Sequence, residues 1–232
     1  MNETGGGTRA GSDGAPTFLE CSVVLFDLDG TLVDSSADLT TTLQRMFAEE
    51  SLADPTRAEV VRWVGDGAAV LLERAYASRR RPVPADAMAR FKTHHDACCL
   101  DETAPYAGIP ELLESLGDRR AAVVTNKPTA FAEKVVAGTG LDTWIQEVVG
   151  PERAPGRKPS PAHCLAALEL LGALPHDAVM VGDGTTDVAA GRAAGLATIG
   201  VLWGFRSREE LQAEHPDALA ADVAELGRLL GR

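Results

Sequence analysis

Short apolar runs that alternate with amphipathic stretches dominate this chain. Five runs are rich in small and β-branched apolar residues at successive positions, which is typical of strands buried on both faces of a parallel sheet. They are SVVLFD (22–27), AAVVTN (121–126), QEVVG (146–150), AVMVGD (178–183) and ATIGVL (197–202). Helix-like stretches that stop at or beside glycines occupy residues 110–118, 129–140, 160–172 and 185–195. The alternation predicts an α/β fold with a doubly wound, mostly parallel sheet.

The region between the first and second runs breaks this rhythm. It contains no strand-like run and predicts helices within residues 37–50, 57–79 and 85–99, separated by prolines. We therefore expect an α-helical cap over residues 35–106, inserted into an α/β core made of residues 19–34 and 107–232. Residues 1–18 are polar and glycine-rich, which predicts a disordered tail.

Composition and charge narrow the class of protein. A chain of 232 residues is long enough for one full core with a smaller insert. Its net charge of -12 argues against nucleic-acid and anionic-membrane partners, which are bound through basic surfaces. It has neither an apolar stretch of about 20 residues nor a signal-like start. Four cysteines without a paired spacing favour the reducing cytoplasm, and the sequence leaves a monomer or a homodimer open.

Polar residues follow several of the apolar runs, at the point where each strand should end. They are Asp27, Thr125, Asn126 and Asp183, with Asp29, Gly30, Thr31, Lys158 and Asp187 nearby in sequence. The carboxyl ends of parallel strands meet in one crevice, so these side chains are expected to converge. Each one alone is also typical of a turn or a helix N-cap, but their ordered recurrence favours a shared site.

The chemistry of this set points to phosphoryl transfer. Carboxylates suit Mg²⁺, which proteins hold through one or two acids together with substrate phosphates. Thr31, Lys158 and the backbone N–H groups beside Gly30 suit phosphate oxygens. A carboxylate beside such a phosphate site can act as the nucleophile.

These motifs resemble those of haloacid dehalogenase superfamily phosphatases, most closely the phosphoglycolate phosphatase group. The resemblance extends from about residue 21 to residue 232 and rests on DLDGTLVDS (27–35), VGDGAAVLLERA (64–75), TNKP (125–128), KPSP (158–161) and GDGTTD (182–187). It implies a Rossmann-like core with a mobile helical cap. It also implies Mg²⁺-dependent hydrolysis of a small phosphorylated metabolite through an aspartyl-phosphate, with 2-phosphoglycolate as the first candidate.

The resemblance assigns roles to the core residues. Asp27 would be the nucleophile, and Asp29 the general acid and base. Thr125 and Asn126 would bind the transferring phosphoryl group. Lys158 would neutralise the charge of the phosphate and of the nucleophile.

The same resemblance implies a metal site and a substrate-facing loop. Asp183 would bind Mg²⁺ together with Asp27 and the carbonyl of Asp29, and Asp187 would hold the metal shell. One position departs from the family pattern: Gly184 stands where many relatives carry a hydroxyl residue. We expect this difference to remove only a minor side-chain contact.

Substrate contacts are expected from residues on both parts of the chain. They are Gly30, Thr31 and Asn126 in the core and Gly65, Asp66 and Gly67 in the cap. A helix–helix turn would use the same glycines in the cap loop.

Several alternatives remain at this stage. The same superfamily contains sugar and nucleotide phosphatases, pyrophosphatases and phosphomutases, and a non-catalytic phosphate-binding or regulatory protein could keep the fold. In HHDACC (94–99), His94/Cys98 and His95/Cys99 have a spacing that a soft-metal site could use, although a packed helix end explains it more simply. Arg206, after the fifth run, either lies near the site or faces solvent.

Overall fold

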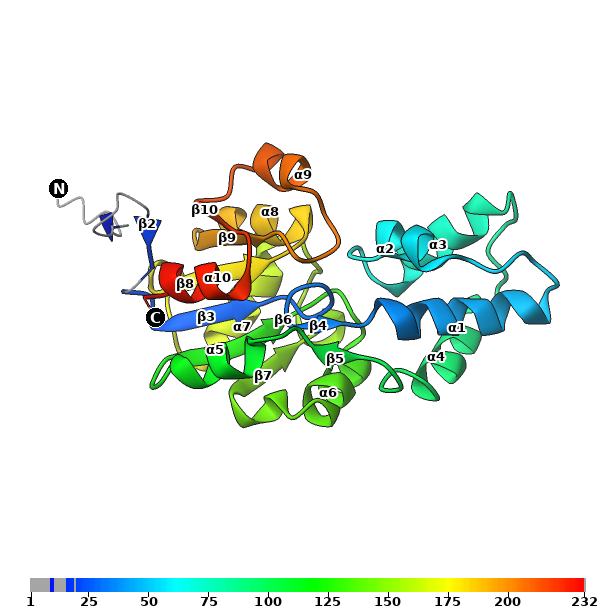
Figure 1. The fold of residues 1–232 in the computed structure, drawn as a ribbon, viewed down its shortest axis with the longest axis horizontal. Coiled ribbons are helices and arrows are strands. Elements are labelled where there is room, and N and C mark those ends of the chain that lie inside the picture. Colours follow the sequence, from blue (N-terminus) through cyan, green and yellow to red (C-terminus); the bar gives the residue numbers. More distant parts are fainter. Residues whose placement is uncertain (1–8, 11–15, 19, 232) are drawn as a thin grey trace.

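Six strands form one parallel sheet at the centre of the molecule (Figure 1). The computed structural model describes residues 9–10, 16–18 and 20–231. In spatial order the strands are β10 (Ala218–Ala220), β9 (Ala197–Val201), β8 (Ala178–Gly182), β3 (Val23–Phe26), β6 (Arg120–Val124) and β7 (Ile145–Val149). All neighbouring pairs run parallel, so their carboxyl ends share one edge of the sheet. The fold class expected from the sequence is confirmed.

Helices cover both faces of this sheet because the side chains of a strand alternate between its faces. Val24 and Phe26 of β3 pack into one hydrophobic layer, while Val23 and Leu25 pack into the other. The first layer includes residues of α5 (Ile109–Ser115), α6 (Thr129–Gly138) and α10 (Val223–Leu229). The second includes residues of α7 (Pro161–Leu171) and α8 (Thr185–Ala193), and α9 (Arg208–Ala213) lies against α8. Short 3₁₀ helices span Leu141–Thr143, Pro151–Arg153 and Pro175–Asp177.

The sequence pattern located the main strands but not the short elements. Each of the five apolar runs forms a strand that starts or ends within one or two residues of its predicted range. The pattern misses β10, α9 and α10, which all lie in the last 25 residues of the chain.

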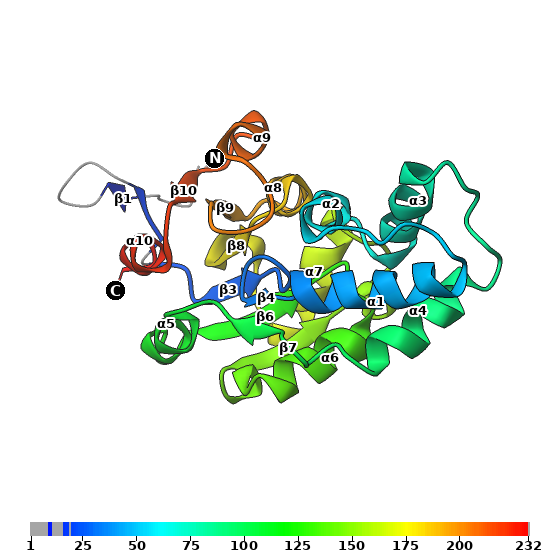
Figure 2. The same ribbon diagram turned by 45° about the vertical axis from the view of Figure 1, so that its right-hand side comes forward.

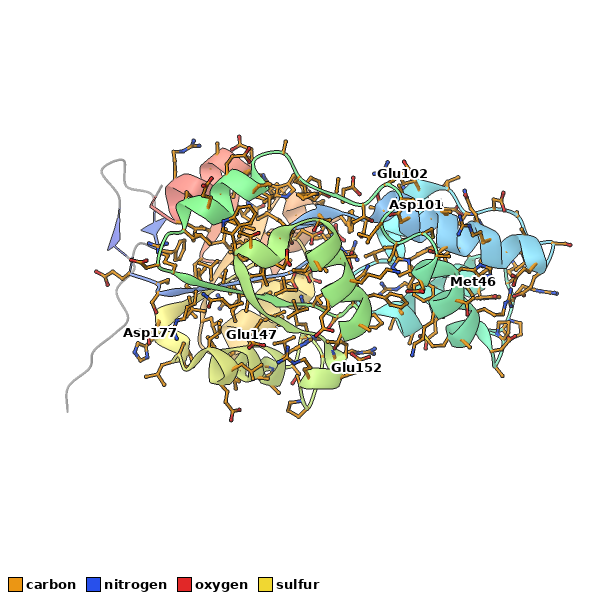
Figure 3. The ribbon with its side chains drawn as sticks, turned by 90° about the horizontal axis from the view of Figure 1, so that it is seen from below. Met46, Asp101, Glu102, Glu147, Glu152 and Asp177 are labelled. Atoms are coloured by element: carbon orange, nitrogen blue, oxygen red, sulfur yellow. The ribbon has the colours of Figure 1, made fainter. Side chains whose placement is uncertain are left out.

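A group of four helices, called here the four-helix segment, lies to one side of the sheet (Figures 1 and 2). It consists of α1 (Ser36–Glu49), α2 (Arg57–Trp63), α3 (Ala68–Ser78) and α4 (Ala87–Asp96). These helices bury a hydrophobic cluster of their own, which includes Phe47 and Tyr76. Met46, labelled in Figure 3, belongs to the same cluster. The helical stretch expected over 57–79 is interrupted at residues 64–67, where the glycines end α2 and begin α3.

Two very short strands mark the place where the chain enters and leaves the four-helix segment. β4 (Val33–Asp34) pairs antiparallel with β5 (Ala104–Pro105). The expectation that residues 36–106 contain no strand is wrong at β5, because a two-residue pairing leaves no pattern in the sequence.

The expected tail, residues 1–18, lies mostly outside the described residues. Within it, β1 (Arg9–Ala10) pairs antiparallel with β2 (Pro16–Thr17), and the Phe18 N–H donates to the Leu229 carbonyl at 2.8 Å. Across the part of the chain that the structure describes, every helix is too short or too polar to cross a membrane.

One buried acid ties the start of the four-helix segment to its end. Asp38 on α1 is 1% exposed, and its carboxylate accepts hydrogen bonds from the N–H groups of Glu102 and Thr103 and from the Thr103 hydroxyl, at 2.7–3.1 Å. A carboxylate has only acceptors, which matches these three donors. Asp38 therefore fixes the return of the chain to the sheet.

Replacing this acid should destabilise the protein. Asp38→Asn turns one acceptor into a donor that faces other donors, so we expect the free energy of unfolding to fall by about 1–3 kcal/mol. Denaturant titration measures the change. Asp101→Asn is the matched control on the neighbouring exposed turn (Figure 3), and an equal effect of both variants would contradict the role given to Asp38.

Candidate active site

The candidate site lies where the order of the strands reverses. The chain adds β6 and β7 on one side of β3 and then places β8 on the other side. Ligands of open α/β sheets bind outside the carboxyl ends of the strands at such a point. Asp27 follows β3 and Asp183 follows β8, and the two strands are adjacent, with Phe26 opposite Val181.

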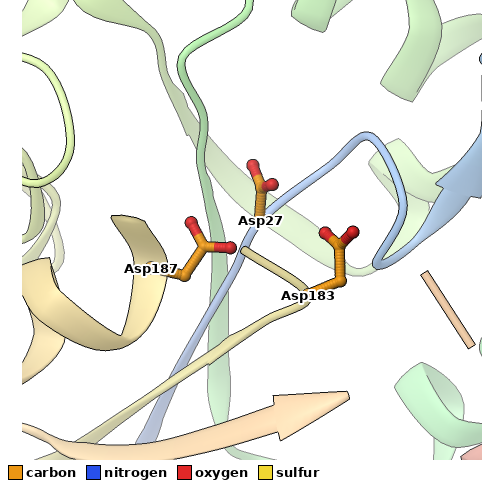
Figure 4. A group of neighbouring side chains, drawn as sticks. All are labelled: Asp27, Asp183 and Asp187. Atoms are coloured by element: carbon orange, nitrogen blue, oxygen red, sulfur yellow. The ribbon is translucent and has the colours of Figure 1, made fainter. Parts of the chain in front are cut away.

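Three carboxylates converge at this edge (Figure 4). Asp27, Asp183 and Asp187 each offer an oxygen, and these oxygens lie within 4.8 Å of one another. All three residues are buried, at 8%, 3% and 1% exposure. Asp187 reaches the group from the first turn of α8, where its Oδ2 accepts the Gly184 N–H at 2.8 Å. Gly184 thus contributes a backbone donor that orients Asp187.

Lys158 is the cation that faces these acids. Its Nζ lies 2.8 Å from Asp27 Oδ1 and 2.6 Å from Asp187 Oδ1, and the residue is 2% exposed. Burial lowers the pKa of Lys158, but Asp187 and Asp27 outweigh that effect and raise it, so the ammonium stays charged. Three carboxylates against one ammonium leave an excess negative charge in a buried place, which is costly unless a further cation is bound.

The same excess charge perturbs the acids themselves. Burial, reinforced by Asp187 and opposed by Lys158, raises the pKa of Asp27 to about 6. Burial and the neighbouring acids Asp27 and Asp187 raise the pKa of Asp183 to about 8. Asp183 therefore tends to hold a proton at neutral pH unless a cation replaces it, while Asp27 is largely ionised there. Oxygen ligands of this kind fit a hard divalent cation.

The loop after β3 wraps around Asp183. The Thr31 hydroxyl lies 3.1 Å from Asp183 Oδ1, and the Asp183 N–H donates to Thr31 Oγ1 at 3.0 Å. Gly30 has φ +91°, and a Cβ at this position would lie 2.4 Å from Asp183 Oδ2. Only glycine allows this approach. Gly30 and Thr31 therefore hold Asp183 in place in the structure.

Asp29 has partners that differ from those of Asp27. Lys127 Nζ lies 3.0 and 3.3 Å from its two carboxylate oxygens, and the Ser35 hydroxyl donates to Oδ1. The Asp29 side chain is outside the three-carboxylate group, and its role as a metal ligand through its carbonyl stays a prediction. Sequence reasoning missed Lys127, although it stands inside the quoted TNKP motif.

Thr125 and Asn126 lie beside these groups, after β6. The Thr125 hydroxyl accepts the Lys127 N–H at 3.1 Å. The Asn126 amide donates to the Lys158 and Gly65 carbonyls, both at 3.0 Å. Asn126 thus joins the core to the loop between α2 and α3.

Two hollows meet between the four-helix segment and the sheet, and both are lined by Asp27 and Asp29. The polar hollow has a volume of about 820 Å³, counting space open to solvent, and includes Asp66, which is paired with Arg74 at 2.5 Å. The apolar hollow has a volume of about 470 Å³ on the same basis. Its lining includes Leu39, Gly65, Gly67, Leu71, Phe91, His95 and Lys127. The structure therefore brings the predicted loop glycines against the core site.

The histidines and cysteines of residues 94–99, at the end of α4 and just after it, have partners within the protein. His94 Nε2 lies 2.8 Å from Glu49, His95 Nδ1 lies 3.0 Å from the Thr42 hydroxyl, and Cys98 Sγ donates to the His94 carbonyl. Among the described residues, the only candidate metal cluster is that of the three aspartates.

Comparison with known proteins identifies the family. The model of the haloacid dehalogenase-like hydrolases matches residues 24–201. The chain belongs to this family. Phosphoglycolate phosphatase from Rhodospirillum rubrum is 40% identical over 218 residues, covering 90% of each chain. The Agrobacterium fabrum protein of the same name is 36% identical over 210 residues, covering 88% of this chain and 90% of its own.

Solved structures of the family share this fold. A predicted phosphoglycolate phosphatase from Haemophilus somnus superposes with a TM-score of 0.83 at 28% identity, covering 90% of this chain and 98% of that one. A predicted phosphatase from Clostridium acetobutylicum gives 0.75 at 27% identity, covering 89% and 96%. The similarity includes both the sheet and the four-helix segment, since it spans nearly the whole length.

The raised pKa values predict how pH and metal act on stability. An acid whose pKa is raised by folding stabilises the protein below its ordinary pKa, near 3.8, and this contribution is lost as pH rises through the folded values of about 6 and about 8. With a chelator, the melting temperature should fall between pH 4 and pH 8. The added stabilisation by a divalent cation should be larger at pH 8 than at pH 5.

Thermal unfolding of the Asp183→Asn variant is the control. It removes the group with the higher pKa, so its melting temperature in chelator should depend less on pH. A cation effect that is equal at pH 5 and pH 8 in the unaltered protein would contradict the metal assignment.

Proposed function

We propose that the protein is a Mg²⁺-dependent phosphatase that hydrolyses a small phosphate monoester through an aspartyl-phosphate. The observation that supports this is the buried group of Asp27, Asp183 and Asp187 around Lys158. Family membership points in the same direction. The chemistry needs a cationic surround, because the nucleophile and the phosphoryl group both carry negative charge.

The proposed reaction uses two carboxylates in turn. Asp27 attacks phosphorus while the ester oxygen leaves as an alcohol, taking a proton from Asp29. Water then attacks the aspartyl-phosphate, giving its proton to Asp29, and inorganic phosphate leaves as Asp27 is restored. Mg²⁺, when bound, would neutralise charge on the phosphoryl oxygens and the nucleophile.

The remaining steps are to orient the two carboxylates and to bind the phosphoryl group. Two lysines and the residues after β6 would do this. Lys158 holds Asp27 Oδ1 by an ion pair, which orients the nucleophile. Lys127 holds Asp29 and offers a cation near the phosphoryl group. Thr125 and Asn126 supply polar groups next to that position. Residues 35–106, which contain the four-helix segment, act as a cap that covers the site and excludes water. The paired strands β4 and β5 lie at the base of this cap.

2-Phosphoglycolate is the first substrate we propose. It is the substrate that gives the two curated relatives their name, and they cover most of this chain. The apolar hollow would take the short leaving group, and Lys127, which pairs with Asp29, also belongs to its lining as a cation near the substrate carboxylate. A small phosphorylated metabolite also fits the cytoplasm, the location we propose from four free, buried cysteines.

A second candidate substrate follows from His95. Burial, with Lys127 and Lys134, lowers the pKa of His95 to about 2, so its ring is neutral. The Thr42 hydroxyl donates its only proton to the Asp38 carbonyl at 2.7 Å, so His95 Nδ1 is the donor to Thr42. Among the described residues, the lone pair of His95 Nε2 then has no partner, and the residue belongs to the lining of the apolar hollow. The nitrogen itself is buried, so a leaving group that carries a hydroxyl would reach this acceptor only when the side chains around it move.

The nucleophile assignment predicts loss of activity on a conservative change. Asp27→Asn should lower the rate of phosphate release by on the order of 10⁴ or more, because the amide is a poor nucleophile. Phosphate release is measured with Mg²⁺ and with a chelator, which should also abolish it. Asp54→Asn, an exposed acid of the four-helix segment, is the control. Normal turnover by Asp27→Asn would refute the mechanism.

A pair of matched esters distinguishes the two substrates. 2-Phosphoglycolate and 2-hydroxyethyl phosphate have leaving groups of similar length that end in a carboxylate and a hydroxyl, respectively. The ester with the higher kcat/KM identifies the class. If His95 accepts from the hydroxyl, His95→Phe should lower kcat/KM for the hydroxyethyl ester by about tenfold and spare the phosphoglycolate value. Equal changes for both esters would mean that His95 serves only to pack.

A further inference from the structure

The segment that follows β9 contacts the acidic site and the four-helix segment at the same time. The Phe205 N–H donates to Asp183 Oδ2 at 2.7 Å. The Phe205 side chain packs against the hydrophobic cluster of the four-helix segment. One residue of the core therefore touches a metal-site acid with its backbone and the cap with its ring.

The next residue, Arg206, extends this connection with its guanidinium group. Nη1 donates to the Val61 carbonyl at 3.2 Å, and Nη2 donates to the Val64 carbonyl. Both acceptors belong to the last turn and the end of α2, where carbonyls lack donors within the helix. A cation at this end also complements the helix dipole. Arg206 is thus a cap for α2 that is supplied by the other part of the molecule.

The next carbonyl along the chain, that of Gly65, also accepts a hydrogen bond from a core residue. Gly65 accepts the Asn126 amide at 3.0 Å, so Val61, Val64 and Gly65 all accept from residues of the core. Gly65 has φ +120°, and a Cβ there would lie 3.2 Å from Arg206 Nη2. The backbone of residues 64–67 therefore lies in close contact with the guanidinium group of Arg206.

We propose that Arg206 is a positioning residue, which docks the loop of residues 64–67 over Asp27 and Asp29 when the cap is closed. The role of the loop in binding substrate rests on the function proposed above. The three accepting groups are backbone carbonyls, so docking depends on the path of the loop and not on its side chains. A planar guanidinium can donate to two carbonyls at once, whereas an ammonium cannot match that fork.

Hydrogen exchange tests the docking without any substrate. In Arg206→Ala, the amides of residues 61–70 should exchange about tenfold or more faster, while those of β3 and β8 keep their protection. Arg206→Lys should recover part of the protection. Arg208→Ala, two residues away on an exposed position, is the matched control and should leave both regions unchanged.

Kinetics provide the second measurement. kcat/KM for the better of the two matched esters should fall by about tenfold to a hundredfold in Arg206→Ala, the range expected when hydrogen bonds from a charged donor are lost. Arg206→Lys should lie between the alanine variant and the unaltered protein. The melting temperature checks that the fold survives the change.

The outcomes separate this proposal from the proposed function. Unchanged exchange at residues 61–70 in Arg206→Ala overturns the docking role, whatever the enzyme hydrolyses. Faster exchange across the sheet as well would mean a general loss of stability, and also overturns it. If the protein hydrolyses no phosphate ester, the proposed function fails, while the exchange measurement still decides the role of Arg206.

Discussion

Three buried carboxylates that face one lysine are the constraint on which the rest of the structure depends. Repulsion among Asp27, Asp183 and Asp187 works against folding, and Lys158 compensates only part of it. The surrounding structure is arranged to tolerate this charge. Backbone and hydroxyl donors from Thr31, Gly184 and Phe205 point at the acids. A divalent cation would complete the compensation, so the feature that costs stability is the one that creates affinity for the metal.

The sheet supplies the precision that this arrangement needs. β3 and β8 are adjacent parallel strands, so a fixed register sets the separation of the acids that follow them. Hydrophobic layers on both faces hold these strands, and side chains on β3 alternate between the layers. Asp27 and Asp183 follow fully buried strands, and Asp187 lies in the first turn of the helix that follows β8.

Much of the sheet and of the acidic site could be predicted from the sequence, for reasons that differ between elements. Strands such as Val23–Phe26 are continuous apolar runs, and acids such as Asp27 follow them directly. Both the position of the sheet edge and the carboxylates on it could therefore be predicted. The two-residue pairing of Val33–Asp34 with Ala104–Pro105 was not, because it involves too few residues for a pattern.

Contacts between distant segments were hidden for a different reason. The roles of Lys127 with Asp29, of Asp38 with Thr103 and of Arg206 with α2 depend on which surfaces meet, and no local sequence pattern reports that. The curated relatives support the substrate class, but the burial of a neutral His95 beside the hollow is a property of three-dimensional packing alone.

The pairing of β4 with β5 has a consequence for how such a protein can change over evolution. The two ends of the inserted helices leave the core side by side, at a separation fixed by two paired residues on each strand. The covalent connections therefore constrain only that short gap, while contacts with Asn126, Phe205 and Arg206 constrain the helices where they meet the core. Insertions or deletions away from these contacts would leave the sheet and its acids in place, because loop-closure entropy grows slowly with length. Selection can then vary the leaving group that is accepted while the phosphoryl chemistry is inherited unchanged.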